Sequence, residues 1–101
     1  MIELSVWTEH GFERTEIDPQ IIRSFSLVNR KIYTNKGTFK TWDKTYRVRL
    51  TDGKLLKIRD HNFKKLKDVF KGKYTSEKQT ELEYKNGSER RATDWHYTIN
   101  V

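Results

Sequence analysis

The chain has 101 residues, of which 21 are Lys or Arg and 14 are Asp or Glu, so its formal net charge at pH 7 is +7. It contains no cysteine, which excludes a disulfide framework, a thiolate metal site and a cysteine nucleophile. Without a targeting signal or an apolar run near the ~20 residues of a membrane span, we expect one cytoplasmic domain over residues 1–101 with no membrane partner.

The first residues predict two short strands. Ile2, Leu4 and Val6 alternate with polar residues, which is typical of a half-buried strand. A turn at residues 9–11 separates this strand from a second one at 12–17.

A longer extended region follows. Asp18 and Pro19 break the second strand, and residues 21–34 then form a mostly apolar run. This run predicts either one bent strand or two short strands around residues 29–30. An Asn-Lys-Gly sequence at 35–37 is a strong turn signal.

A hairpin is predicted over residues 44–59, around a Thr-Asp-Gly turn. A two-residue loop would place Val48 opposite Lys57 and mix apolar and charged side chains on one face. A three-residue loop with Gly53 in the left-handed conformation pairs Val48 with Leu56 and separates the two faces, so we prefer it. One face then carries four cations: Arg47, Arg49, Lys57 and Arg59.

One helix is predicted at about residues 62–71. Its apolar stripe consists of Phe63, Leu66, Val69 and Phe70. Asp60 or Asn62 is suited to cap its start and Gly72 to end it.

The C-terminal region predicts a hairpin with a two-residue loop at Asn86 and Gly87. This register places Glu83 across from Arg90. It gathers on one face Leu82, Tyr84, Trp95, Tyr97, Ile99 and Val101. The elements together predict a mainly β fold with one α-helix (α+β), which is either a small antiparallel sheet or a curled barrel, with the helix inserted before the C-terminal hairpin.

The positive charge is concentrated between Lys54 and Lys73, where eight cations face two acids, whereas the first twenty residues are acidic. Polarised charge of this kind steers polyanions. We therefore predict a small basic module that binds nucleic acid. Its phosphate contacts are Arg47, Arg49, Lys57, Arg59, Lys64 and Lys71. Exposed aromatic residues such as Trp7, Tyr33 or Trp42 would stack on unpaired bases.

Catalysis is not expected. The chain lacks a phosphate-binding loop and a dinucleotide fingerprint. Its histidines are predicted to be a turn, a helix-start and a solvent-face strand residue: His10, His61 and His96. The triplet at 83–85, an acid and a lysine around one residue, with Asp68 or Glu77 upstream, fits the pattern of a metal-dependent nuclease, but Glu83 has a structural partner in Arg90. We predict no enzyme, no metal and no cofactor.

A second class of function fits the same features. A small protein-interaction or inhibitor module, of the kind that phages and other mobile elements encode, would use the cations to bind an acidic surface on a partner protein. A homodimer through an exposed strand edge is a third alternative.

Overall fold

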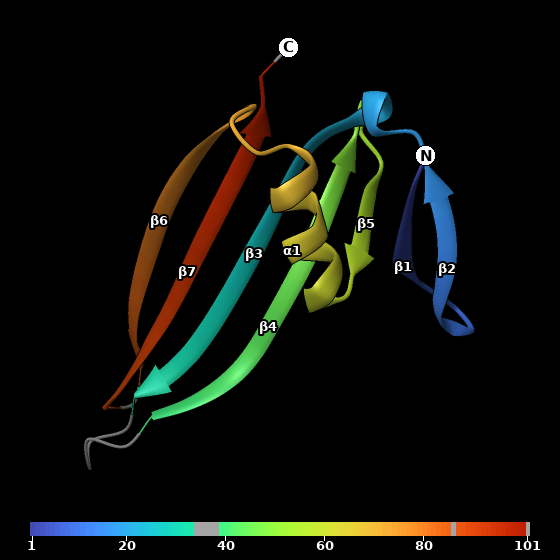
Figure 1. The fold of residues 1–101 in the computed structure, drawn as a ribbon. Coiled ribbons are helices and arrows are strands. Elements are labelled where there is room, and N and C mark those ends of the chain that lie inside the picture. Colours follow the sequence, from blue (N-terminus) through green and yellow to red (C-terminus); the bar gives the residue numbers. More distant parts are fainter. Residues whose placement is uncertain (34–38, 86, 101) are drawn as a thin grey trace.

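The computed structural model describes residues 1–33, 39–85 and 87–100, which form an open antiparallel sheet of seven strands with one α-helix on one face (Figure 1). The strand order is β2-β1-β5-β4-β3-β7-β6. The elements are β1 (Ile2–Thr8), β2 (Gly11–Ile17), the short 3-10 helix η1 (Pro19–Ile21), β3 (Ile22–Tyr33), β4 (Phe39–Leu50), β5 (Leu55–Ile58), α1 (Asp60–Val69), β6 (Tyr74–Lys85) and β7 (Ser88–Ile99). The predicted α+β class is confirmed. The curled barrel is wrong, because β2 and β6 end the sheet at opposite edges.

The N-terminal strands form as the sequence indicated. Ile2, Leu4 and Val6 of β1 are all buried, and β2 pairs with β1 along its whole length. The predicted break after β2 is the start of η1, where Asp18 Oδ1 accepts a hydrogen bond from the Gln20 N–H at 2.9 Å. This cap turns the chain toward β3.

The apolar run at 21–34 forms one bent strand, which was the first of the two alternatives. β3 has 12 residues, and its register against β4 shifts between Arg30 and Lys31. At this shift the extra residue is Trp42 of β4, so the bulge belongs to β4. The extra residue of β3 is Arg23, at a second shift between Ile22 and Ser24. The turn predicted at 35–37 lies outside the described residues.

The hairpin of β4 and β5 has the register of the three-residue loop. Val48 pairs with Leu56 and Tyr46 pairs with Ile58, as predicted. Gly53 has φ of 89°, in the region that favours glycine. Local turn chemistry therefore decides which side chains of this hairpin lie on which face.

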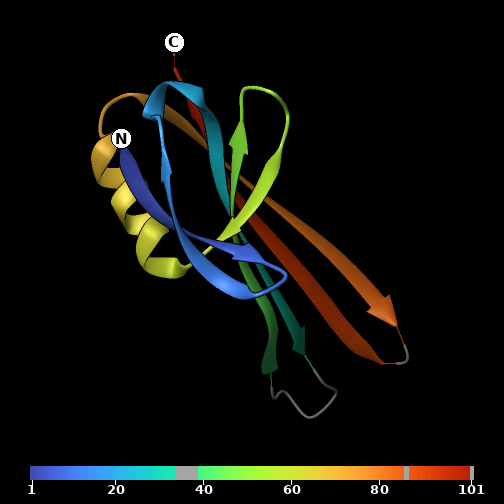
Figure 2. The same ribbon diagram turned by 90° about the vertical axis from the view of Figure 1, so that its right-hand side faces the viewer.

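The helix α1 begins and ends slightly earlier than predicted, at Asp60 and Val69. It lies against one side of the sheet (Figure 2). Phe63 and Leu66 are buried against the sheet, whereas Val69 is 44% exposed, because at 100° per residue it falls on the flank of the apolar stripe. Within the described ranges, no helix has the length and apolar character to cross a membrane.

The C-terminal hairpin also has its predicted register, with Glu83 opposite Arg90. The apolar face that the sequence assigned to it is only partly covered, since Leu82 and Tyr84 are 51% and 75% exposed. A ten-residue helix is about 15 Å long, whereas a twelve-residue strand spans about 40 Å. The helix therefore covers one half of the long strands and leaves the other half without a second layer (Figure 1). The Asn86 and Val101 side chains lie outside the described residues.

The core lies between α1 and the sheet, with Phe25 of β3 at its centre. Phe25 is 1% exposed, stacks on Tyr97 at 5.0 Å between ring centroids and contacts the ring edge of Phe63 at 5.5 Å. The buried apolar side chains are Ile2, Leu4, Val6, Ile17, Ile22, Phe25, Val48, Leu50, Ile58, Phe63, Leu66 and Phe70. The apolar core of the described residues thus lies on a single face of the sheet, whose strands are joined by backbone hydrogen bonds.

The buried side chain of Asn62 forms hydrogen bonds that connect β1 to the rest of the fold. In the described residues, β1 and β5 share one register pair, Val6 with Ile58. Asn62 of α1 is 2% exposed, and its Oδ1 accepts hydrogen bonds from the Ser5 N–H at 2.9 Å and the Arg59 N–H at 3.4 Å. The side chain therefore joins β1, the end of β5 and the first turn of the helix.

We expect Asn62→Ala to lower the free energy of unfolding by about 1–3 kcal/mol, because two backbone N–H groups lose a buried acceptor. Urea unfolding followed by circular dichroism measures this change. His61→Ala is the matched control on the exposed side of the same helical turn, with an expected change within about 0.5 kcal/mol. Equal effects in the two variants would contradict the role assigned to Asn62.

Candidate nucleic-acid interface

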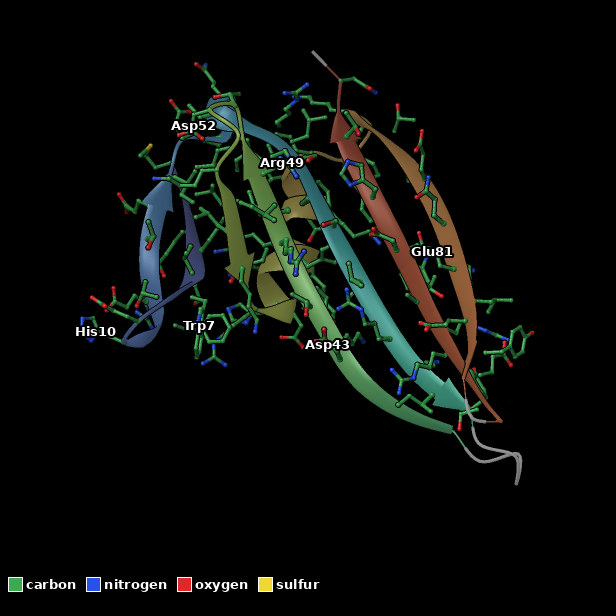
Figure 3. The ribbon with its side chains drawn as sticks, turned by 180° about the vertical axis from the view of Figure 1, so that it is seen from behind. Trp7, His10, Asp43, Arg49, Asp52 and Glu81 are labelled. Carbon is green, nitrogen blue, oxygen red and sulfur yellow. The ribbon has the colours of Figure 1, made fainter. Side chains whose placement is uncertain are left out.

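The sheet has two different faces. The covered face packs against α1, and the open face lies on the other side, toward the viewer in Figure 3. Side chains alternate between the two faces along each strand. Because Val48 and Ile58 are buried under α1, their neighbours Arg47, Arg49 and Lys57 belong to the open face.

Four of the six predicted phosphate contacts come together on this open face. They are Arg47, Arg49, Lys57 and Arg59, which we call the cationic set. Arg47 lies directly opposite Lys57 in the hairpin register, and Arg49 is exposed. Like charges in directly opposed positions destabilise a strand pair by a few tenths of a kcal/mol, and a bound polyanion would relieve that repulsion.

The other two predicted contacts lie elsewhere. Lys64 and Lys71 are exposed, on α1 and just beyond its end, so the sheet separates them from the cationic set. The sequence placed the hairpin and the helix on one surface because they are adjacent along the chain. The chain instead leaves the sheet at Arg59, at the end of β5, and continues into α1 on the covered side.

An aromatic pair adjoins the cationic set on the open face. Trp7 of β1 and Phe12 of β2 are register partners, with ring centroids 5.1 Å apart at an interplanar angle of 72°. Lys57 Nζ lies 5.3 Å from the Trp7 ring centroid, and the Arg59 guanidinium carbon lies 4.3 Å from that of Phe12. These are cation–π distances. Trp7 remains 53% exposed, so its ring is accessible to a ligand.

Together these residues form a row across four strands. Phe12 pairs with Trp7, and Arg47 pairs with Lys57. Since Val6 pairs with Ile58, the next residue of β1, Trp7, lies beside Lys57. Neighbouring strands are about 4.8 Å apart, so the row from Phe12 to Arg47 extends about 14 Å across the sheet.

The sequence predicted part of this aromatic surface and missed the rest. Trp7 is exposed, as predicted, and the fold places it beside Lys57. Phe12 was not singled out, although its position across the predicted turn at 9–11 would have paired it with Trp7. Tyr33 lies on the covered face, where its ring centroid is 4.9 Å from the Arg91 guanidinium carbon. The side chain of Trp42 lies outside the described residues.

The opposite edge of the open face is acidic. Glu77, Glu81 and Glu83 alternate along β6 and share the face of the cationic set. Figure 3 shows Glu81 and Trp7 near opposite edges of the sheet. The open face is therefore a polarised surface, and a polyanion has a favoured half on which to lie.

Arg30 is an open-face cation that is held by an internal partner. Its Nη1 donates to Asp43 Oδ2 at 2.6 Å, and the Thr45 hydroxyl donates to Asp43 Oδ1 at 2.7 Å. These hydrogen bonds, that of Thr45 first, hold the pKa of Asp43 below its ordinary value, against the opposing effect of burial. A lowered carboxyl pKa stabilises the fold at neutral pH, and this contribution is lost as the pH falls through the folded-state pKa.

The histidines occupy the predicted kinds of position. His10 lies in the turn between β1 and β2, His61 in the first turn of α1, and His96 on the open face of β7. In the part of the chain that the structure describes, no three His, Cys, Asp or Glu side chains gather in a way that could hold a metal ion. Of the upstream acids of the nuclease pattern, Asp68 is on α1, on the other side of the sheet from Glu83. Glu77 shares the open face of β6 with Glu83 but lies six residues away, about 20 Å along the strand.

The structure also has a hollow outside the cationic set. It has a volume of about 700 Å³ and lies between η1, the end of α1 and the end of β7, where Ile22, Phe70 and Ile99 line it. It is mainly apolar and contains none of the predicted site residues.

Comparisons with protein-family models, with curated proteins and with solved structures find no match to this chain. The site must therefore be interpreted from its own chemistry.

Proposed function

We propose that this protein is a non-enzymatic nucleic-acid-binding module, which holds the polyanion against the open face of β1, β5 and β4. The observation that supports this most is the row formed by Trp7, Lys57 and Arg47. It combines an exposed aromatic ring with cations at neighbouring positions of one sheet face. Single-strand-binding surfaces use the same combination.

Each part of the row has a distinct role in this proposal. Arg47, Arg49 and Arg59 contact phosphate oxygens with their planar guanidinium groups, and Lys57 supplies a looser charge. Trp7 stacks on an unpaired base, which is worth about 1–3 kcal/mol per base. The acidic edge at β6 repels phosphate, so the strand stays on the cationic half.

The test is a fluorescence titration with single-stranded and duplex oligonucleotides of equal length at low and physiological salt. We expect the single strand to quench tryptophan fluorescence. With four phosphate contacts, raising the salt from about 50 to about 200 mM should weaken binding about fifty-fold.

The Trp7→Phe variant shows whether Trp7 is the tryptophan whose fluorescence is quenched. Phenylalanine retains a stacking surface, so binding measured by anisotropy should persist while most of the quenching disappears. Quenching that persists unchanged in this variant would place the ligand near Trp42 or Trp95 and contradict the proposed interface. Trp95 is on the covered face.

The alternative is a protein-interaction or inhibitor module, in which the cationic set binds an acidic surface of a partner protein. Both readings suit the cytoplasmic location expected from the sequence. A folded chain that gives no response to either oligonucleotide at low salt would favour the protein partner. A homodimer would double the cationic surface, and light scattering of the free protein tests it.

A further inference from the structure

The open face is hollowed along β3, next to the cationic set. Ser24 and Ser26 have small side chains, whereas Arg49 and Arg47 pair with them from β4 on one side, and His96 pairs with Ser26 from β7 on the other. The larger side chains form two walls above the serines. The hollow between them has a volume of about 270 Å³.

One wall of this hollow offers hydrogen-bond donors. Arg47 and Arg49 alternate on the same strand face, about 7 Å apart along β4. Guanidinium groups bind phosphate through paired charge-assisted hydrogen bonds, and the Ser26 hydroxyl on the floor is a further donor. This wall is suited to a phosphate group.

The other wall offers an acceptor. Asp94 of β7 lines the same hollow, and its inner oxygen, Oδ1, is buried without a hydrogen-bond partner among the described residues. Buried carboxylate oxygens normally have a donor. Because Asp94 itself lines the hollow, its carboxylate is within reach of a group that enters there and can accept a hydrogen bond from it.

We propose that this hollow binds one unpaired nucleotide of a single strand, with its phosphate on Arg47 and Arg49 and the amino group of its base on Asp94. This inference rests on the proposed function and specifies which part of the nucleic acid the hollow binds. The two walls are two strand spacings apart, about 10 Å, so one nucleotide bridges them. The volume lies just below the ~300 Å³ at which small-molecule pockets begin, which leaves room for one base and none for a base pair.

The hydrogen bond to Asp94 distinguishes bases that carry an amino group from those that do not. Cytosine, adenine and guanine carry an exocyclic amino group, whereas thymine presents a carbonyl oxygen and a methyl group. A carboxylate accepts a hydrogen bond from an amino group and repels a carbonyl oxygen. The hollow therefore favours cytosine over thymine, two bases of similar size and stacking surface.

The experiment compares oligo-dC with oligo-dT of equal length at neutral pH, by anisotropy. Both lack a terminal 5′-phosphate, so every phosphate present is an internal diester. We expect the wild-type protein to bind oligo-dC about tenfold more tightly than oligo-dT, and Asp94→Ala to bring this ratio close to one. Glu77→Ala is the matched control. It removes the same charge from the neighbouring strand, and it should leave the ratio unchanged.

The outcomes separate this inference from the proposed function. Equal, salt-dependent binding of the two oligonucleotides by the wild type would overturn the inference and leave the cationic interface standing. A ratio that survives in Asp94→Ala would also overturn it. Absence of binding to either oligonucleotide would remove both proposals. Should Asp94→Ala fail to fold, the wild-type ratio alone still decides.

Discussion

Reversal of two open-face charges, Arg49→Glu together with Lys57→Glu, is expected to abolish oligonucleotide binding and leave the fold intact. Both side chains are exposed, so glutamate can replace them without burying charge. The variant removes two phosphate contacts and places two negative charges in their positions. At about 1.5 kcal/mol for each lost charge-assisted contact, binding should weaken by more than about 100-fold. Anisotropy titration at low salt measures the affinity.

The chain provides a control of equal charge. Lys64→Glu with Lys71→Glu lowers the net charge by the same amount, at exposed positions on the covered side. If the open face is the interface, this control retains most of the affinity and loses only the long-range attraction, which salt screens. Equal losses in the two double variants would show that net charge, and no particular surface, drives binding. A larger loss in the helix variant would move the interface to α1.

Replacement of Phe25 by alanine is expected to have the largest effect on stability. The Phe25 ring is 1% exposed and contacts aromatic side chains from α1, β6 and β7, including Phe63, Tyr74 and Tyr97. Deletion of a buried phenylalanine ring costs about 3–5 kcal/mol. Small domains have about 5–15 kcal/mol in total, so the variant should lose a large part of its stability. Thermal and urea unfolding measure the loss.

Two further variants make this result interpretable. Phe25→Leu retains most of the buried volume and should cost clearly less than the alanine variant. Leu82→Ala removes an apolar side chain from the same side of the sheet beyond the end of α1, where Leu82 is 51% exposed, and should cost little. A loss for Leu82→Ala as large as that for Phe25→Ala would mean that the half of the sheet beyond the helix is covered in solution, for example by a second copy of the chain.

Local patterns predicted the hairpins of this protein well. The registers that pair Val48 with Leu56 and Glu83 with Arg90 follow from turn residues and from the need to keep apolar side chains on one face. The same reasoning placed Arg47 and Arg49 together, because residues two apart on a strand share a face. In these cases every interacting residue is close along the chain.

The order of the strands could not be predicted in this way. β1 lies beside β5, and β3 beside β7, although in each pair the two strands are far apart in the sequence. These pairings bring Trp7 next to Lys57 and put Ser26 between Arg47 and His96. No local pattern contains that information.

The sequence alone therefore predicted the helix, most of the strands, the registers of two hairpins and the three cations, Arg47, Arg49 and Lys57, that share one face of β4 and β5. The tertiary structure alone decided that the sheet stays open, that Lys64 and Lys71 lie across it from Arg49, and that Trp7 joins the cations. The physical reason is that a hairpin face is set by side-chain alternation within a few residues. Strand order depends instead on which long-range arrangement buries Phe25 and its neighbours beneath α1.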